Sequence, residues 1–144
     1  MAHAAAMNEL TVSRSRLVLR ANAAFSTIGG LIAVIGAGWL SDVSGIDHVL
    51  ITRLGGVGLL LFAADVYRLS RLAERKLPYA LLQTSIADGS WVIATVVVLT
   101  VVDLTTWGTI GAIVIAVAVA DFGITQLWLR SRLTGPSAIA PAAA

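Results

Sequence analysis

Residues 107–129, WGTIGAIVIAVAVADFGITQLWL, contain a single ionisable side chain, Asp121, in a stretch long enough to cross a lipid bilayer. A helix rises about 1.5 Å per residue and the hydrocarbon core is about 30 Å thick, so about 20 apolar residues are enough to span it. Three similar stretches precede this one, at residues 17–40, 50–69 and 80–102. The sequence therefore predicts an all-α protein, a transmembrane four-helix bundle with short connections.

The composition of the 144-residue chain agrees with this prediction and excludes several classes of site. Hydrophobic residues make up 58% and charged residues 12%, whereas soluble domains contain about 45–50% and about 25%. The net charge is only +2, so we expect no nucleic-acid partner. Cysteine is absent, and neither histidine, His3 or His48, falls in a predicted span. We therefore expect no metal centre, haem or other cofactor.

The segments outside the spans divide the chain into three parts. We expect residues 1–16 to form a disordered N-terminal tail and residues 134–144 to form a flexible C-terminal tail, leaving 17–133 as the transmembrane domain. The first span is longer than the 7–15 apolar residues of a signal peptide, and three more spans follow it. It is therefore interpreted as a retained helix.

Basic residues predict the orientation of the chain. Nine of the ten flank one side of the predicted bundle, and Arg53 alone falls on the other side. The nine are Arg14, Arg16, Arg20, Arg68, Arg71, Arg75, Lys76, Arg130 and Arg132. Since basic residues near span ends are retained in the cytoplasm, we expect both termini and the middle loop to be cytoplasmic.

The two predicted hairpins, 17–72 and 80–133, then share one orientation. Each carries an Ala-Asp pair in its second helix, at 64–65 and 120–121, and each ends in Ser-Arg-Leu. These short matches raise the hypothesis of a parallel two-hairpin repeat.

Small residues recur every four positions on the first and fourth spans. Because lipid provides no hydrophobic drive between helices, such stripes bring helix backbones into close contact. We expect them to pack the helices, and to mediate self-association or contact with another membrane protein. The residues are Gly29, Ala33, Ala37, Gly108, Ala112 and Ala116.

Three aspartates, Asp65, Asp88 and Asp121, lie within the apolar stretches. A charged side chain at membrane depth costs about 2.5–3.5 kcal/mol, so each needs a partner, a proton or water. Asp65 precedes Arg68 by three residues on one helical face, which predicts an ion pair near the inner surface. Asp88 and Asp121 lie deeper, at similar distances from the cytoplasmic ends of their helices.

Polar residues at that depth on three helices form one candidate site if their faces point inward. In this arrangement Arg20 or Asn22 would be the partner of Asp88 or Asp121. Two interpretations remain open: a buried network that fixes the helix register, and a proton or cation site. The candidate residues are Arg20, Asn22, Ser26, Asp88, Trp91, Asp121 and Thr125.

Two motifs carry a resemblance to a known group. Residues 19–26, LRANAAFS, open the first span, and residues 88–91, DGSW, lie in the third. The chain resembles, over about residues 16–133, a group of small uncharacterised bacterial four-helix integral membrane proteins with a Leu-Arg-x-Asn-Ala-x-Phe-Ser start and Asp-x-x-Trp in the third span. The resemblance implies that Arg20, Asn22, Ser26, Asp88 and Trp91 form a linked set, but it implies no activity.

For function, the sequence favours a non-enzymatic multi-pass protein of the bacterial cytoplasmic membrane, acting as an accessory subunit, assembly factor or scaffold. The small size and the lack of a nucleophile with a paired base argue against an enzyme. The alternative is a small proton- or cation-coupled transporter that uses the intramembrane aspartates.

Overall fold

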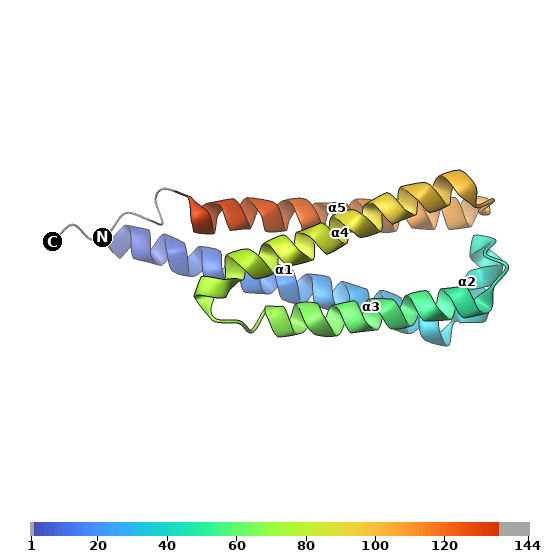
Figure 1. Ribbon diagram of the computed structural model, residues 1–144, viewed down its shortest axis with the longest axis horizontal. Coiled ribbons are helices and arrows are strands. Elements are labelled where there is room, and N and C mark those ends of the chain that lie inside the picture. Colours follow the sequence, from blue (N-terminus) through green and yellow to red (C-terminus); the bar gives the residue numbers. More distant parts are fainter. Residues whose placement is uncertain (1, 136–144) are drawn as a thin grey trace.

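The computed structural model describes residues 2–135, and all regular structure in that range is helical (Figure 1). Four of the helices, α1, α3, α4 and α5, are long and apolar enough to cross a membrane, as predicted. The predicted C-terminal tail lies outside the described residues from position 136 onward. The elements are α1 (Ala2–Ile35), α2 (Ala37–Ser44), α3 (Val49–Leu69), the 3₁₀ turn η1 (Glu74–Lys76), α4 (Leu77–Val101) and α5 (Thr106–Thr134).

The four long helices run side by side, and each lies antiparallel to its neighbours (Figure 1). Helix α1 packs most extensively on α3, and α4 packs on α5. The two pairs meet chiefly between α1 and α5. The start of α1, the end of α5 and η1 therefore lie at one end of the bundle, and α2 and the α4–α5 connection lie at the other. We call these the η1 end and the α2 end.

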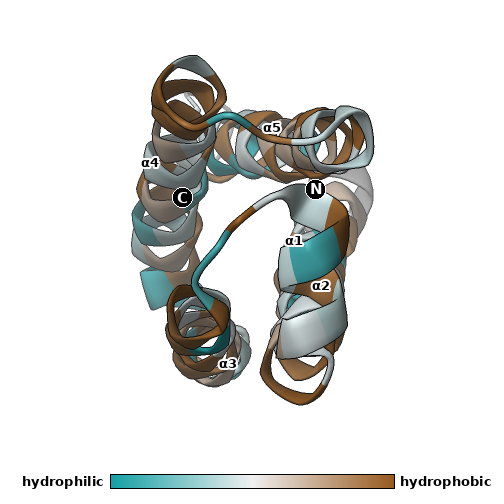
Figure 2. Ribbon diagram, turned by 90° about the vertical axis from the view of Figure 1, so that its right-hand side faces the viewer, coloured by the Kyte–Doolittle hydropathy of each residue, from teal (hydrophilic) through white to brown (hydrophobic). Residues whose placement is uncertain are grey.

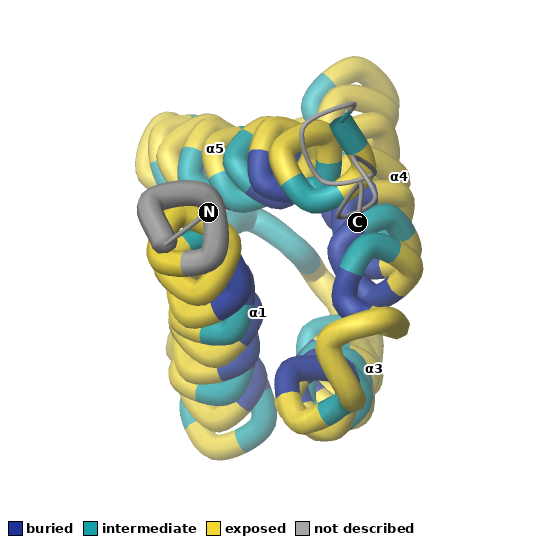
Figure 3. The backbone as a smooth tube through the Cα atoms, turned by 90° about the vertical axis from the view of Figure 1, so that its left-hand side faces the viewer, coloured by how far each residue is buried: buried dark blue, intermediate teal, exposed yellow. Residues whose placement is uncertain are grey.

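The distribution of side chains is the reverse of that in a soluble protein. Large apolar residues such as Ile35, Val101 and Trp107 are more than two-thirds exposed. Buried positions include the polar residues Asn22 and Gln126. Figure 2 shows apolar ribbon on all four long helices, and Figure 3 shows the buried positions facing the centre. This pattern is typical of a bundle surrounded by lipid.

The expectation of a disordered N-terminal tail at residues 1–16 is corrected by the structure, because α1 begins at Ala2 rather than near residue 17. Val12, Ser15 and Leu19 follow helical spacing and are buried. Arg16 donates hydrogen bonds to the carbonyl oxygens of Ser70 (3.2 Å) and Leu72 (3.0 Å) just beyond α3. Hydropathy alone missed this segment, since its buried face is narrow and its exposed face is polar.

The first predicted span, 17–40, is divided at Gly36. This residue departs from helical backbone angles (φ −92°, ψ 19°), and the short helix α2 continues from Ala37. Helix α2 ends at Gly45, whose positive φ of 82° closes it with a left-handed cap that glycine adopts without steric cost. The bend turns α2 across the end of the bundle towards α5.

Glycine allows α1 and α3 to approach closely. A β-carbon added at Gly56 would lie 2.9 Å from the Ala33 β-carbon and 2.9 Å from the Gly30 carbonyl oxygen. Gly58, two residues later on α3, faces open space. A β-carbon at Gly30 would likewise lie 2.9 Å from the Gly56 carbonyl oxygen, so the α1–α3 contact depends on this facing pair of glycines rather than on glycine content in general.

The packing of α4 differs along its length. All of its buried residues lie at or before Asp88, in the half nearer the η1 end. At the α2 end, the Thr105 amide donates to the Ser44 carbonyl (3.0 Å), and its hydroxyl donates to the Val43 carbonyl. Gly108 contacts the Ser44 backbone directly. These contacts hold the start of α5 against the end of α2, whereas the half of α4 beyond Asp88 has no buried side chain.

Candidate functional site

A cluster of polar side chains joins three helices in the interior of the bundle. Asp88 of α4 accepts a hydrogen bond from the Asn22 amide of α1 (2.8 Å) and another from the Gln126 amide of α5 (3.1 Å), both at Oδ2. The Ser26 hydroxyl donates to the Asn22 side-chain oxygen at 3.4 Å. All four residues are at least 95% buried. We call them the Asp88 cluster.

The buried face of each helix explains why these residues meet. On α4, Leu81, Thr84 and Ser85 precede Asp88 on the buried side. On α5, Gln126 lies three residues from both Gly123 and Leu129, which are also buried. Helical spacing of three and four keeps such residues on one side of a helix.

Gly123 brings α5 close to α4 at the level of Asp88. A β-carbon added there would lie 3.6 Å from the Asp88 β-carbon. The Ser85 hydroxyl donates to the Gly123 carbonyl at 3.0 Å. This close approach allows the shorter side chain of Asp88 and the longer one of Gln126 to bridge the two helices.

In the Asp88 cluster, the carboxyl group is hydrogen-bonded by neutral amides and not by a cation. The one ion pair among the side chains that the structure describes, those of residues 6–135, joins Asp65 and Arg68 at 2.9 Å, so no cationic side chain of that range neutralises Asp88. The Gln126 side-chain oxygen is buried and has no hydrogen-bond partner in the described chain. The cluster therefore has an acid and an unused acceptor on adjoining helices, which suits it to hold a proton or a proton donor.

The Asp88 cluster contains no histidine or cysteine side chain. Among the described side chains of residues 6–135, no group of three or more His, Cys, Asp or Glu converges. Asp88 is the only carboxylate in the cluster, and its other members are amides and a hydroxyl.

The structure separates the remaining candidate residues from this cluster. Arg20 and Asp121 are exposed, Trp91 is 39% exposed, and Thr125 is half-buried. The expected pairing of Arg20 with Asp88 or Asp121 is not formed. The reason is helical geometry. Arg20 lies about 160° from Asn22 around α1, and Asp121 lies about 140° from Gln126 around α5.

Trp91 lies outside the Asp88 cluster for a different reason. It lies three residues after Asp88, on nearly the same face, but α4 has no buried residue beyond Asp88. Trp91 is therefore only partly covered, although the sequence motif links it to Asp88.

Sequence reasoning missed Gln126, because it concentrated on charged residues and followed the face of Asp121. The available signal was the spacing of Val119, Gly123, Gln126 and Leu129, all of which are buried. The predicted ion pair between Asp65 and Arg68 is confirmed, and the Gln83 amide also donates to Asp65 at 3.4 Å.

Compared with protein-family models, with curated proteins and with solved structures, the chain matches none of them.

Proposed function

We propose that the chain is a non-enzymatic multi-pass protein of the bacterial cytoplasmic membrane that acts as an accessory subunit, assembly factor or scaffold for another membrane protein. The observation that carries this proposal is the exposure of Asp121 on α5. An acid that faces lipid costs about 2.5–3.5 kcal/mol. Contact with a polar or cationic group of a partner removes that cost.

The depth of Asp121 supports this argument. The residue lies about 13 Å along the helix from Arg130 and about 22 Å from the start of α5 at Thr106. It forms no ion pair among the described residues. It is therefore too far from either end of α5 for its short side chain to reach the membrane surface.

Apolar side chains continue the face on which Asp121 lies. Val114, Val117, Ile124 and Trp128 occur at spacing of three and four around it and are between 49% and 68% exposed. We call this set, with Asp121, the α5 face. Such spacing is that of a helix–helix contact, in which the acid selects the partner and the apolar residues provide the area.

The small-residue stripes contribute less to this docking than expected. Ala33, Ala37 and Gly108 are buried within the chain, where they pack its own helices, and Gly29, Ala112 and Ala116 are half-buried. We therefore propose the α5 face as the docking surface, either for another membrane protein or for a second copy of the chain.

Native co-purification tests the proposal. The tagged chain, extracted in a mild detergent, should migrate as a stoichiometric complex, and Asp121→Asn should dissociate it. Asp103→Asn is the matched control, because it makes the same chemical change at an exposed acid between α4 and α5. A chain that is monomeric and unchanged by Asp121→Asn would contradict the proposal, and a complex containing only this chain would identify self-association.

A second candidate function is a small proton- or cation-coupled transporter, and the geometry that favours it is the Asp88 cluster. In that role Asp88 would exchange a proton or cation while Asn22 and Gln126 hold its carboxyl group. Proteoliposomes with an internal pH indicator provide the test. Ion-dependent uptake that is lost in Asp88→Asn and retained in Asp103→Asn would support transport, and absence of uptake by the folded wild-type chain would exclude it.

A further inference from the structure

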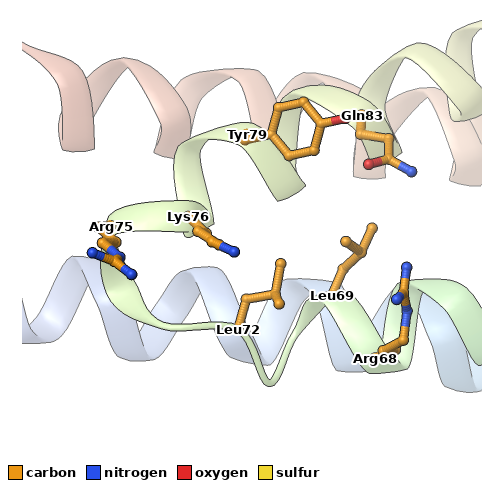
Figure 4. Close-up of a pocket in the computed structure, with 7 residues that line it drawn as sticks. All are labelled: Arg68, Leu69, Leu72, Arg75, Lys76, Tyr79 and Gln83. Atoms are coloured by element: carbon orange, nitrogen blue, oxygen red, sulfur yellow. The ribbon is translucent and has the colours of Figure 1, made fainter.

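A cationic pocket lies between the end of α3 and the start of α4, and none of the residues that line it belongs to the Asp88 cluster (Figure 4). Its volume is about 560 Å³. Leu69 and Leu72 provide its apolar wall. The polar residues that line it are Arg68, Arg75, Lys76, Tyr79 and Gln83.

The charge in this pocket is only partly compensated. Arg68 is paired with Asp65 at 2.9 Å, and Gln83 also donates to Asp65. Arg75 and Lys76 are exposed, and neither forms an ion pair with a carboxylate of the described chain. Glu74 belongs to the same turn but does not line the pocket. Two cationic groups are thus available to a ligand.

The position of the pocket limits what it can hold. It opens at the η1 end, where two transmembrane helices are joined by a short connection (Figure 1). In Figure 4, Arg68 and Lys76 extend from opposite sides towards the space between Leu69 and Tyr79. A ligand in this space meets positive charge, a phenol and an amide at the membrane surface, and an apolar wall below them.

We propose that this pocket binds a phosphate group, with Arg75 and Lys76 as its cationic ligands. Guanidinium and ammonium groups form charge-assisted hydrogen bonds with phosphate oxygens. Basic pockets between membrane helices on the cytoplasmic side favour anionic phospholipid headgroups. The same chemistry would accept free phosphate from the cytoplasm. This inference rests on the proposed membrane location and orientation, but not on the proposed role as a subunit, assembly factor or scaffold.

Basic residues at this end also orient the chain, and that role requires no ligand. The chain offers a control that separates the two roles. Arg71 stacks over the Tyr67 ring (5.8 Å), and Arg132 stacks over the Trp128 ring (5.0 Å); neither lines the pocket. Arg71→Gln with Arg132→Gln therefore removes as much charge as Arg75→Gln with Lys76→Gln.

The experiment measures lipid retention by native mass spectrometry of the detergent-solubilised chain, titrated with phosphatidylglycerol or phosphatidylcholine. We expect preferential retention of phosphatidylglycerol. Since each cationic group that contacts the headgroup contributes about a fivefold factor, the Arg75→Gln, Lys76→Gln variant should bind phosphatidylglycerol about 30-fold more weakly. The Arg71→Gln, Arg132→Gln variant should bind it as the wild type does.

A competition arm distinguishes the source of the phosphate. Inorganic phosphate that binds the delipidated chain and displaces phosphatidylglycerol, with the same dependence on Arg75 and Lys76, would identify a soluble ligand. Retention of phosphatidylglycerol in excess phosphate would identify a lipid. Equal losses in the two double variants, or no preference for the anionic lipid in the wild type, would overturn the proposal. Because all four substituted residues are exposed, helicity by circular dichroism should be unchanged in both variants.

Discussion

Asn22 and Asp88 are 66 residues apart in the chain and are joined by a hydrogen bond of 2.8 Å between α1 and α4. Gln126 of α5 donates to the same carboxylate oxygen. One acid therefore links three of the four long helices. In lipid, such interhelical hydrogen bonds contribute about 0.6 kcal/mol on average and up to about 1.7 kcal/mol.

The first prediction concerns this link. Asn22→Ala should lower the free energy of unfolding by about 1 kcal/mol, because it removes one of two donors from a buried acid. Unfolding by sodium dodecyl sulfate in mixed micelles measures the change. Ser90→Ala, at an exposed residue two positions after Asp88, is the control, and equal stability of the two variants would show that the cluster does not hold the helices together.

The second prediction concerns the α1–α3 contact. Gly56→Ala should destabilise the bundle by about 1–3 kcal/mol, because the new methyl group would overlap Ala33 and the Gly30 carbonyl. Gly58→Ala, on the same helix, faces open space and should be neutral or slightly stabilising. The same unfolding assay compares them, and a reversed order would refute the proposed packing of α1 on α3.

The third prediction concerns Arg16, which ties the start of α1 to the end of α3. Arg16→Gln removes two hydrogen bonds to backbone carbonyls and should lower the free energy of unfolding by about 1 kcal/mol. Hydrogen exchange of the amides of residues 69–72 should become faster. Arg14→Gln, at an exposed position two residues earlier, should leave both quantities unchanged; faster exchange in both variants would point to a general charge effect.

The fourth prediction concerns orientation. The start of α1, the end of α5 and η1 share one end of the bundle (Figure 1), and the basic residues cluster there in sequence. A reporter that is active only in the cytoplasm should be active when fused after Lys76 and inactive when fused after Asp103. The opposite pattern would reverse the proposed topology.

Much of the fold was predictable from hydropathy, because membrane spans are long and their apolar character is nearly continuous. The helices at 50–69, 80–102 and 107–129 were predicted within a few residues at most boundaries. The error at α1 arose because its first turns are stabilised by tertiary contacts of Val12 and Arg16, which hydropathy does not detect. The division at Gly36 was missed because glycine occurs in continuous membrane helices as well.

The candidate site was harder to predict than the fold. Asn22, Ser26 and Asp88 do converge. Their distances from the cytoplasmic ends of the predicted spans indicated that they share one depth. The faces of Arg20 and Asp121 depend on how each helix is rotated about its axis, and packing decides that rotation. On α5, the search for charged residues favoured Asp121, whereas the α5 residue that contacts Asp88 is the neutral Gln126.

The Asp88 cluster also has a consequence for biosynthesis. Its members come from the first, third and fourth long helices, and a ribosome synthesises these in that order. Until α5 has been inserted, Asp88 lacks the Gln126 donor, and the nascent bundle contains an incompletely solvated acid. Arrival of the last helix completes the set of donors, so in a chain that terminates before Gln126 the Asp88 carboxylate would keep only the Asn22 donor.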